Sequence, residues 1–229
     1  VYVYDAHGTK YLDLYGGHAV ISIGHSQSDF VSNIKEQLDQ IAFYSNAVKN
    51  PLQGQLANAI AEHSCLYDYQ LFLCSTGAEA IENALKLASF HTQKKRVIAF
   101  ENAFHGRTSA AVSVTDNPSI NAPLNAQHEV TFLPFNDHIL LEKELKKGDV
   151  CAVIFEAIQG VGGLDQPDEG FIYAMESLCK KFDACLIADE VQSGFARTGT
   201  FFAFQKYRIS PHIITMAKGM GNGFPIGGI

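Results

Sequence analysis

Six short apolar runs, which lie between residues 70 and 216, constrain the fold of this chain more than any other feature of its sequence. Helical or loop-rich stretches separate them. This alternation is typical of an α/β domain with a largely parallel sheet that is flanked by helices. The runs are Gln70–Cys74, Arg96–Phe100, Val130–Leu133, Val150–Phe155, Cys185–Ala188 and Ile213–Met216.

The residues before these runs predict a small opening unit. Val1–Leu14 alternates between apolar and polar residues on both sides of Asp5-Ala6-His7-Gly8, which is typical of two short strands joined by a turn. Apolar residues then recur at helical spacing over residues 30–41. We expect a second helix to begin at Pro51, because proline suits the first helical position.

Composition and charge exclude several classes of protein. The chain has 229 residues, 47% of them hydrophobic, so it is long enough to bury a sizeable core and is not disordered. Its 24 acidic and 17 basic side chains give a net charge of −7, and its longest basic run is Lys94-Lys95-Arg96, which argues against a nucleic-acid partner. No apolar stretch reaches the roughly 20 residues of a membrane span, and we expect neither a membrane segment nor an export signal.

Two further features concern location and assembly. The five cysteines form no Cys-x-x-Cys motif and lie mostly in apolar runs, so we expect reduced thiols in a cytoplasmic protein. Charged residues make up 18% of the chain, below the roughly 25% of typical soluble domains. This low share suggests that a partner subunit or a further segment covers part of the surface.

The residues that follow each apolar run are the candidate functional residues, because ligands bind at the carboxyl ends of parallel strands. After the first run, Thr76 and Glu79 have the spacing of a capping box at the start of a helix. The small residues Gly77 and Ala78 would let an anion approach the amides of that helix N-terminus. The turn is therefore either a phosphate site or only a well-capped helix.

An acid and a lysine follow two of the later runs. Asp189 directly follows the run Cys185–Ala188. Its carboxylate could bind a metal, cap the next helix or face a cationic ring nitrogen, or it could simply lie at a solvated strand end. Lys218 follows the run Ile213–Met216 in a glycine-rich segment. Desolvation there would disfavour its charged form and make it a nucleophile suited to Schiff-base chemistry, although a surface lysine is the alternative.

Other strand ends offer an aromatic ring, a cation and a second carboxylate. Phe104 and Arg107 follow the second run. Phe104 could stack on a ring or belong to the core, and Arg107 could clamp a carboxylate or be a surface charge. Glu156 follows Val150–Phe155. The sequence has no zinc-type histidine spacing, no Gly-x-Ser-x-Gly elbow and no complete dinucleotide fingerprint. We therefore expect no metal, and hydrolase and dinucleotide functions are disfavoured.

Several of these segments match one known family. The segment from Leu186 to Gly199 includes Asp189-Glu190-Val191-Gln192, and Ala217-Lys218-Gly219 follows it at the family's spacing. Thr76-Gly77-Ala78-Glu79-Ala80 and Phe104-His105-Gly106-Arg107-Thr108 also match. In these segments the chain resembles the class III aminotransferases, within fold type I of the pyridoxal phosphate enzymes. Within the family, the chain most resembles the members that act on acetylornithine or succinylornithine, and residues 11–20 and 223–228 carry this similarity.

The resemblance implies a domain organisation. Residues 1–45 would contribute to a small domain, and residues 46–229 would form the large domain that binds pyridoxal 5′-phosphate. Family members continue through a C-terminal small domain, which we expect this chain to lack. A homodimer is implied as well, in which the partner subunit contributes to the cofactor phosphate site.

The resemblance also implies a role for each candidate residue. Lys218 would bond covalently to the cofactor and act as the base, while Asp189 would pair with the ring nitrogen. The other residues implied to bind the cofactor are Thr76, Gly77 and Ala78 at the phosphate, Phe104 and Val191 on the two ring faces, Gln192 at the ring hydroxyl, and His105. The residues implied to bind substrate are Arg107, Glu156 and His18.

The implied reaction moves the terminal amine of an N-acylated ornithine to 2-oxoglutarate, giving a semialdehyde and glutamate in arginine or ornithine metabolism. Two alternatives stay open: another class III enzyme, such as an ornithine or other omega-aminotransferase, an aminomutase or a decarboxylase, and a non-catalytic module. Ornithine-type members often have a glutamate where this chain has Val161. A different arrangement is therefore expected to admit 2-oxoglutarate.

Overall fold

The computed structural model describes residues 1–45 and 47–229. The chain divides into two compact units, Val1–Leu71 and Phe72–Ile229. The domain boundary expected between residues 45 and 46 stays a prediction, and Asn46 lies outside the described residues. No helix among the described residues is long and apolar enough to cross a membrane.

The first unit has the elements that its sequence predicts. Strands β1 (Tyr2–Tyr4) and β2 (Lys10–Leu12) pair antiparallel. Asp5 Oδ1 closes the turn between them by accepting hydrogen bonds from the backbone N–H groups of His7 and Thr9, each at 2.9 Å. The helices of this unit are α1 (Gly16–Ala19), α2 (Ser28–Gln40) and α3 (Pro51–Ser64), and α3 begins at Pro51 as expected.

The second unit contains the predicted parallel sheet. Its strand order is β5-β4-β6-β7-β8, and all neighbouring strands are parallel. The strands are β4 (Arg96–Phe100), β5 (Val130–Leu133), β6 (Val150–Phe155), β7 (Cys185–Asp189) and β8 (Ile213–Thr215). The helices are α4 (Gly77–Thr92), α5 (Ser109–Ser113), α6 (His138–Leu145) and α7 (Glu169–Lys181), with short 3₁₀ turns η1 (Pro118–Ile120), η2 (Pro123–Asn125), η3 (Ala203–Tyr207) and η4 (Lys218–Met220).

The run Gln70–Cys74 differs from its prediction. Only β3 (Leu73–Cys74) is a strand, and it pairs antiparallel with β9 (Gly227–Gly228) instead of joining the parallel ladder directly. An antiparallel bridge between Met216 and Gly228 links β9 to the end of β8. The chain beyond Lys218 therefore turns back and places β9 between β3 and β8, which local sequence patterning does not reveal.

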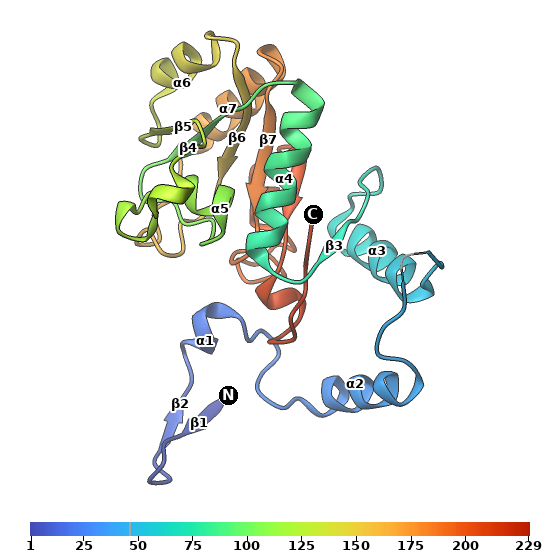
Figure 1. Ribbon diagram of the computed structural model, residues 1–229. Helices are drawn as coiled ribbons and strands as arrows, with labels where there is room; N and C mark the ends of the chain where they lie inside the picture. The colour runs from blue at the N-terminus through green and yellow to red at the C-terminus, as the bar shows by residue number, and fades with distance from the viewer. Residues whose placement is uncertain (46) are drawn as a thin grey trace. The chain divides into compact units, whose positions relative to one another are not determined.

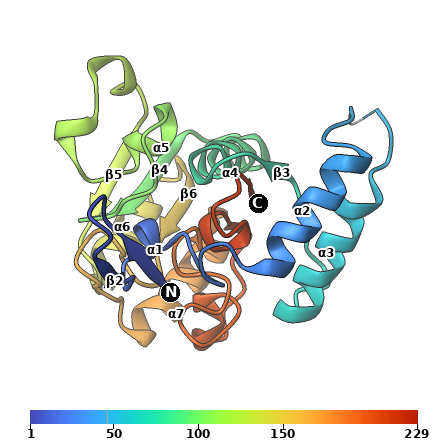
Figure 2. The same ribbon diagram turned by 90° about the horizontal axis from the view of Figure 1, so that it is seen from below.

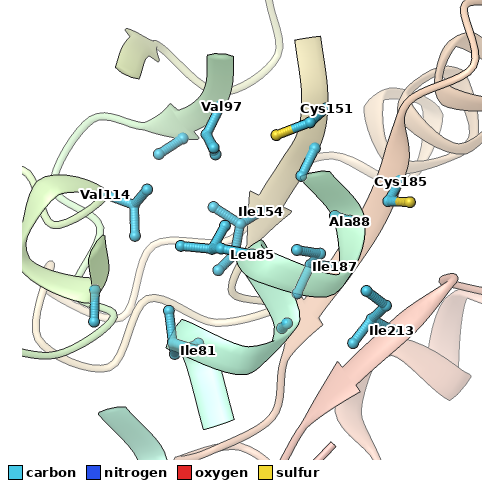
Figure 3. Close-up of a cluster of buried hydrophobic side chains, with 14 residues drawn as sticks. Ile81, Leu85, Ala88, Val97, Val114, Cys151, Ile154, Cys185, Ile187 and Ile213 are labelled. Carbon is cyan, nitrogen blue, oxygen red and sulfur yellow. The ribbon is translucent and has the colours of Figure 1, made fainter. Parts of the chain in front are cut away.

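Helices cover both faces of the parallel sheet. On β4, Val97 and Ala99 belong to the apolar cluster beneath α4, whereas Phe100 contacts Phe171 of α7 with ring centroids 5.7 Å apart. Successive side chains of a strand point to opposite faces, so α4 and α7 lie on opposite sides of the sheet, as the two ribbon views show (Figure 1, Figure 2). Figure 3 shows the cluster between α4 and the sheet, with Leu85 close to Ile154.

Candidate active site

Half of the capping box predicted after the first apolar run is present at the start of α4. Thr76 Oγ1 accepts a hydrogen bond from the Glu79 N–H at 3.1 Å. Glu79 Oε2 accepts one at 2.7 Å from the N–H of Ser75, the residue before the N-cap, instead of from the Thr76 N–H. The first intrahelical bond runs from the Ala80 N–H to the Thr76 carbonyl at 3.0 Å. Within residues 1–45 and 47–229, this leaves the N–H groups of Gly77 and Ala78 available to an anion.

Close packing at Gly77 joins this turn to the ends of two strands. A Cβ atom at Gly77 would lie 2.8 Å from Val191 Cγ1 and 3.4 Å from Ala217 Cβ. Val191 follows Asp189 at the end of β7, and Ala217 precedes Lys218 beyond β8. The helix N-terminus, the acid and the lysine, which sequence analysis selected separately, therefore lie around one place in the second unit.

Asp189 is buried at the end of β7 and is held from three directions. Its Oδ1 accepts hydrogen bonds from the Val191 N–H at 3.0 Å and from Thr215 Oγ1 at 3.2 Å. Its Oδ2 lies 2.7 Å from Nδ1 of His105. The contact with Thr215 follows from the strand register, which places Thr215 opposite Asp189. Thr215 was not among the residues predicted for the site, although a polar residue at the end of an apolar strand is a signal that the sequence contains.

His105 forms a buried ion pair with Asp189. Its backbone N–H is fixed by Thr115 Oγ1 at 2.9 Å, and its Nε2 atom has no hydrogen-bond partner within the described part of the chain. Burial lowers the pKa of His105, but the hydrogen bond to Asp189 and the charges of Asp189 and Glu156 outweigh it, so the pKa is raised. The imidazolium form is thereby favoured beside the carboxylate.

Glu156 supports the turn that carries Phe104. It follows β6, and its two carboxylate oxygens accept hydrogen bonds from the Phe104 N–H at 3.0 Å and from the Gly160 N–H at 3.2 Å. Burial raises its pKa, the nearby Asp189 charge raises it further, and His105 opposes both. Glu156 thus fixes backbone at the same edge of the sheet where His105 and Asp189 meet.

Lys218 lies at the same edge, partly buried, in a strained backbone conformation with φ of 45°. Burial lowers the pKa of its amine, and the positive charge of Arg197 adds to this effect. The charges of Asp189 and Glu156 oppose the shift without cancelling it. The amine is therefore easier to deprotonate than that of an ordinary surface lysine.

The remaining predicted residues differ in their placement. The Gln192 side chain packs against Gly160, because a Cβ atom at Gly160 would clash with Gln192 Oε1. Phe104 is partly buried and Arg107 is exposed, both in the second unit. His18 belongs to the first unit, where its Nδ1 lies 2.6 Å from the Tyr15 hydroxyl. The structure thus brings the candidate cofactor residues together, whereas the substrate roles of Arg107, Glu156 and His18 stay predictions.

These residues fit pyridoxal 5′-phosphate. The amides of Gly77 and Ala78 suit a phosphate, and Asp189 offers a buried anion that would pair with a protonated ring nitrogen. Lys218 supplies an amine with a lowered pKa on the neighbouring strand end. Among the described residues, no cluster of three or more His, Cys, Asp or Glu side chains is arranged to hold a metal ion.

Comparisons with known proteins agree with this site. The family model "Aminotransferase class-III" matches residues 1–229. The acetylornithine aminotransferase of Bacillus subtilis (strain 168) is 41% identical over 232 residues, covering 100% of this chain and 59% of its own length. That of Archaeoglobus fulgidus is 43% identical over 227 residues, covering 99% and 60%. The chain thus spans about three fifths of the length of these curated relatives.

Solved structures of aminotransferases match this chain over almost its whole length. The ornithine aminotransferase of Toxoplasma gondii ME49 matches with a TM-score of 0.91 and 28% identity, covering 99% of this chain and 56% of that one. The N-acetylornithine aminotransferase of Stenotrophomonas maltophilia K279a matches with a TM-score of 0.84 and 33% identity, covering 99% and 58%. The fold is that of the fold type I large domain, and the family's cofactor is pyridoxal 5′-phosphate. Fold, site and family model agree: the chain belongs to the class III aminotransferases.

Proposed function

We propose that this chain provides the cofactor-binding part of an aminotransferase that moves the terminal amine of an N-acylated ornithine to 2-oxoglutarate. One observation carries the proposal: Asp189, paired with the buried His105, ends β7, and Lys218 follows the neighbouring strand β8, beside the N-terminus of α4. The names of relatives that are 41% and 43% identical support acetylornithine as the amino donor. When bound, pyridoxal 5′-phosphate supplies a ring that accepts the electron pair of the bond broken at the substrate carbon.

Lys218 supplies the proton-transferring group of the proposed reaction. Burial lowers the pKa of its amine, which increases the neutral fraction that can accept a proton from the amino-bearing carbon of the substrate. The protonated amine can then return that proton to a neighbouring carbon. The charges of Asp189 and Glu156 stabilise this protonated form, so the amine is suited to both directions of transfer.

Asp189 and His105 act as one electrostatic unit. Asp189 would face the ring nitrogen of the cofactor, and its negative charge would favour the protonated ring in a buried site. The 2.7 Å contact from His105 Nδ1 fixes the orientation of the carboxylate, while Thr215 and the Val191 N–H hold its other oxygen. His105 is therefore a positioning residue, since it acts through Asp189.

The phosphate and the ring faces have their own partners in the proposal. The amides of Gly77 and Ala78 would hold the phosphate with Thr76, and Phe104 and Val191 would enclose the ring. Gln192 would bind the ring hydroxyl, and Arg107 a substrate carboxylate. A homodimer completes the phosphate site in this proposal, and the protein is assigned to the cytoplasm. The exposed apolar side chains of the first unit, such as Leu14 and Phe43, support a partner subunit.

An assay of amino donors tests this function. The purified protein is incubated with pyridoxal 5′-phosphate, 2-oxoglutarate and one amino donor, and glutamate formation is followed. We expect acetylornithine or succinylornithine to exceed free ornithine in kcat/KM, and Lys218→Ala to give no glutamate. Higher kcat/KM with free ornithine would replace the substrate assignment with an ornithine-type one. Borohydride reduction that leaves no cofactor bound to Lys218 would overturn the function itself.

A further inference from the structure

Glu190 is a buried carboxylate that the proposed reaction does not use. Glu190 directly follows Asp189 in the sequence, and it is only 1% exposed. Its Oε2 accepts hydrogen bonds from Ser193 Oγ at 2.8 Å and from the Ala203 N–H at 2.9 Å. Its Oε1 accepts one from the Phe204 N–H at 2.9 Å. Burying a second carboxylate beside Asp189 is costly, so these contacts require an explanation beyond simple filling of space.

The hydrogen bonds to Glu190 tie together the two ends of one loop, residues 191–204. Ser193 lies near the start of this loop, and Ala203 and Phe204 lie at its end, where η3 begins. The Glu190 carbonyl also accepts a bond from the Gly194 N–H at 3.0 Å. A Cβ atom at Gly194 would lie 2.7 Å from that carbonyl oxygen, so only glycine fits this approach.

Aromatic packing makes the same loop compact. Phe195 and Phe201 contact each other with centroids 5.3 Å apart, and Phe201 contacts Phe202 at 4.8 Å. Phe202 in turn stacks on Phe204 at 5.8 Å. A loop that is closed at its base by one carboxylate and filled by its own rings behaves as one body, so its position depends on Glu190.

The loop carries groups that act on the candidate active site. It begins with Val191, which packs beside Gly77 at the phosphate turn, and with Gln192, which lies over Gly160. It also carries Arg197, whose positive charge acts on the amine of Lys218. Movement of this loop would therefore change two things together: the contacts of Val191 and Gln192 with the cofactor ring, and the electrostatic environment of the Lys218 amine.

We propose that Glu190 is a positioning residue, which closes loop 191–204 and thereby sets Val191, Gln192 and the charge of Arg197 against the cofactor and Lys218. This inference rests on the proposed function, because it assumes that the cofactor binds between Asp189 and Lys218. Glu190 touches neither of them in the proposal and acts only through the loop. Replacing a carboxylate oxygen with an amide nitrogen would place a donor against backbone donors and open the loop at its base.

The variant Glu190→Gln tests this inference, with Glu144→Gln as the matched control. Glu144 is also a buried carboxylate, but it pairs with Arg96, far along the chain from the loop. The readouts are the dissociation constant of pyridoxal 5′-phosphate and the pH midpoint of the visible absorption change of the bound cofactor. Unfolding in urea and amide hydrogen exchange of residues 191–204 are measured on the cofactor-free protein.

We expect Glu190→Gln to weaken cofactor binding at least fivefold, to move the spectral midpoint and to speed exchange in the loop. Glu144→Gln should lower stability without these changes. Loss of stability alone in Glu190→Gln, with affinity and midpoint equal to those of the parent, would overturn the inference. If Glu190→Gln does not fold, Ser193→Ala removes one of the bonds and should move affinity and midpoint by less, in the same direction; no movement overturns it. Failure of the parent protein to bind the cofactor would instead refute the proposed function.

Discussion

The amino edge and the carboxyl edge of the parallel sheet both bury charged side chains, but they treat them differently. At the amino edge, the guanidinium of Arg96 donates to Thr131 Oγ1 at 2.8 Å and to the carboxylate and carbonyl of Glu144, each at 2.9 Å. It also forms a forked contact with Asp149, at 2.7 to 3.0 Å. This network closes on itself, and the bond to Asp149 raises the pKa of Arg96 despite burial.

At the carboxyl edge, polar groups are held in place, but some of their hydrogen-bonding atoms have no partner among residues 1–45 and 47–229. His105 Nε2 has no partner within the described part of the chain, and the Gly77 and Ala78 amides are likewise available there. Burial raises the pKa of Glu156 and lowers that of Lys218. The charged network at the amino edge is closed and stabilises the fold, whereas the buried groups at the carboxyl edge include donors without a partner among the described residues, which favours a ligand site.

The largest expected effect is that of Lys218→Ala at the carboxyl edge. This change removes both the covalent attachment and the base, so kcat for glutamate formation should fall by at least about 10³-fold. The fold should persist, since Lys218 is only partly buried. Lys86→Ala removes an exposed lysine on α4 and serves as the control, with unchanged kcat. If Lys218→Ala formed glutamate at the parental rate, Lys218 would not be the base, and the carboxyl edge would not be distinguished from the amino edge by its chemistry.

Arg96→Met should have the largest effect at the amino edge, and it should act on stability alone. The change leaves Asp149 without its main partner and Glu144 with Lys147 as its remaining cation. Breaking a buried ion pair costs about 3–5 kcal/mol. We expect the free energy of unfolding in urea to fall by about that amount, with the dissociation constant of pyridoxal 5′-phosphate unchanged. A weaker affinity for the cofactor would show that the two edges are coupled.

His105→Gln should give a smaller loss at the carboxyl edge. It removes a hydrogen bond to a charged group, which is worth about 1.5–3 kcal/mol, or about 10- to 100-fold in rate if the interaction is needed in the transition state. Single-turnover measurements of proton transfer test this expectation. The pH midpoint of the bound cofactor's absorption should also move, whereas a purely structural role of His105 would lower stability and leave that midpoint in place.

A separate prediction at the carboxyl edge concerns the pH dependence of stability. Burial raises the pKa of Glu190 from 4.5 to about 7, so its contribution to stability is fully present below pH 4.5 and is lost as pH rises through about 7. One pKa unit corresponds to about 1.4 kcal/mol, so the loss amounts to about 3 kcal/mol. Urea unfolding from pH 4.5 to 7.5 should show a shallower decline with pH in Glu190→Gln than in the parent.

The pKa of Glu144, at the amino edge, is shifted in the opposite direction to that of Glu190. The hydrogen bond from Lys147 lowers the pKa of Glu144, and Arg96 adds to this effect against burial. Its stabilisation is therefore present above the unfolded pKa and is lost as pH falls through the folded pKa. Glu144→Gln should flatten the acidic side of the same stability profile. Identical pH profiles for the two variants would contradict the contrast between the edges.

Local sequence patterning predicted the elements of this fold well. The strands β4, β5 and β6 match the predicted apolar runs, and the start of α3 and the Thr76 cap of α4 lie where expected. Such features depend on residues that are close in sequence, namely apolar periodicity and hydrogen bonds between a cap and the next turn. The family resemblance added the candidate cofactor residues, although not their contacts.

Only the tertiary structure decided which of these residues meet. His105 and Asp189 are 84 positions apart, and Glu190 closes its loop through residues 13 and 14 positions away. The insertion of β9 beside β3 depends on how the glycine-rich segment beyond Lys218 turns back. These pairings follow from strand register and from packing across the sheet. The sequence by itself determined the strands and their end residues, because neighbouring residues specify them, while the pairs at the site exist only once the strands lie side by side.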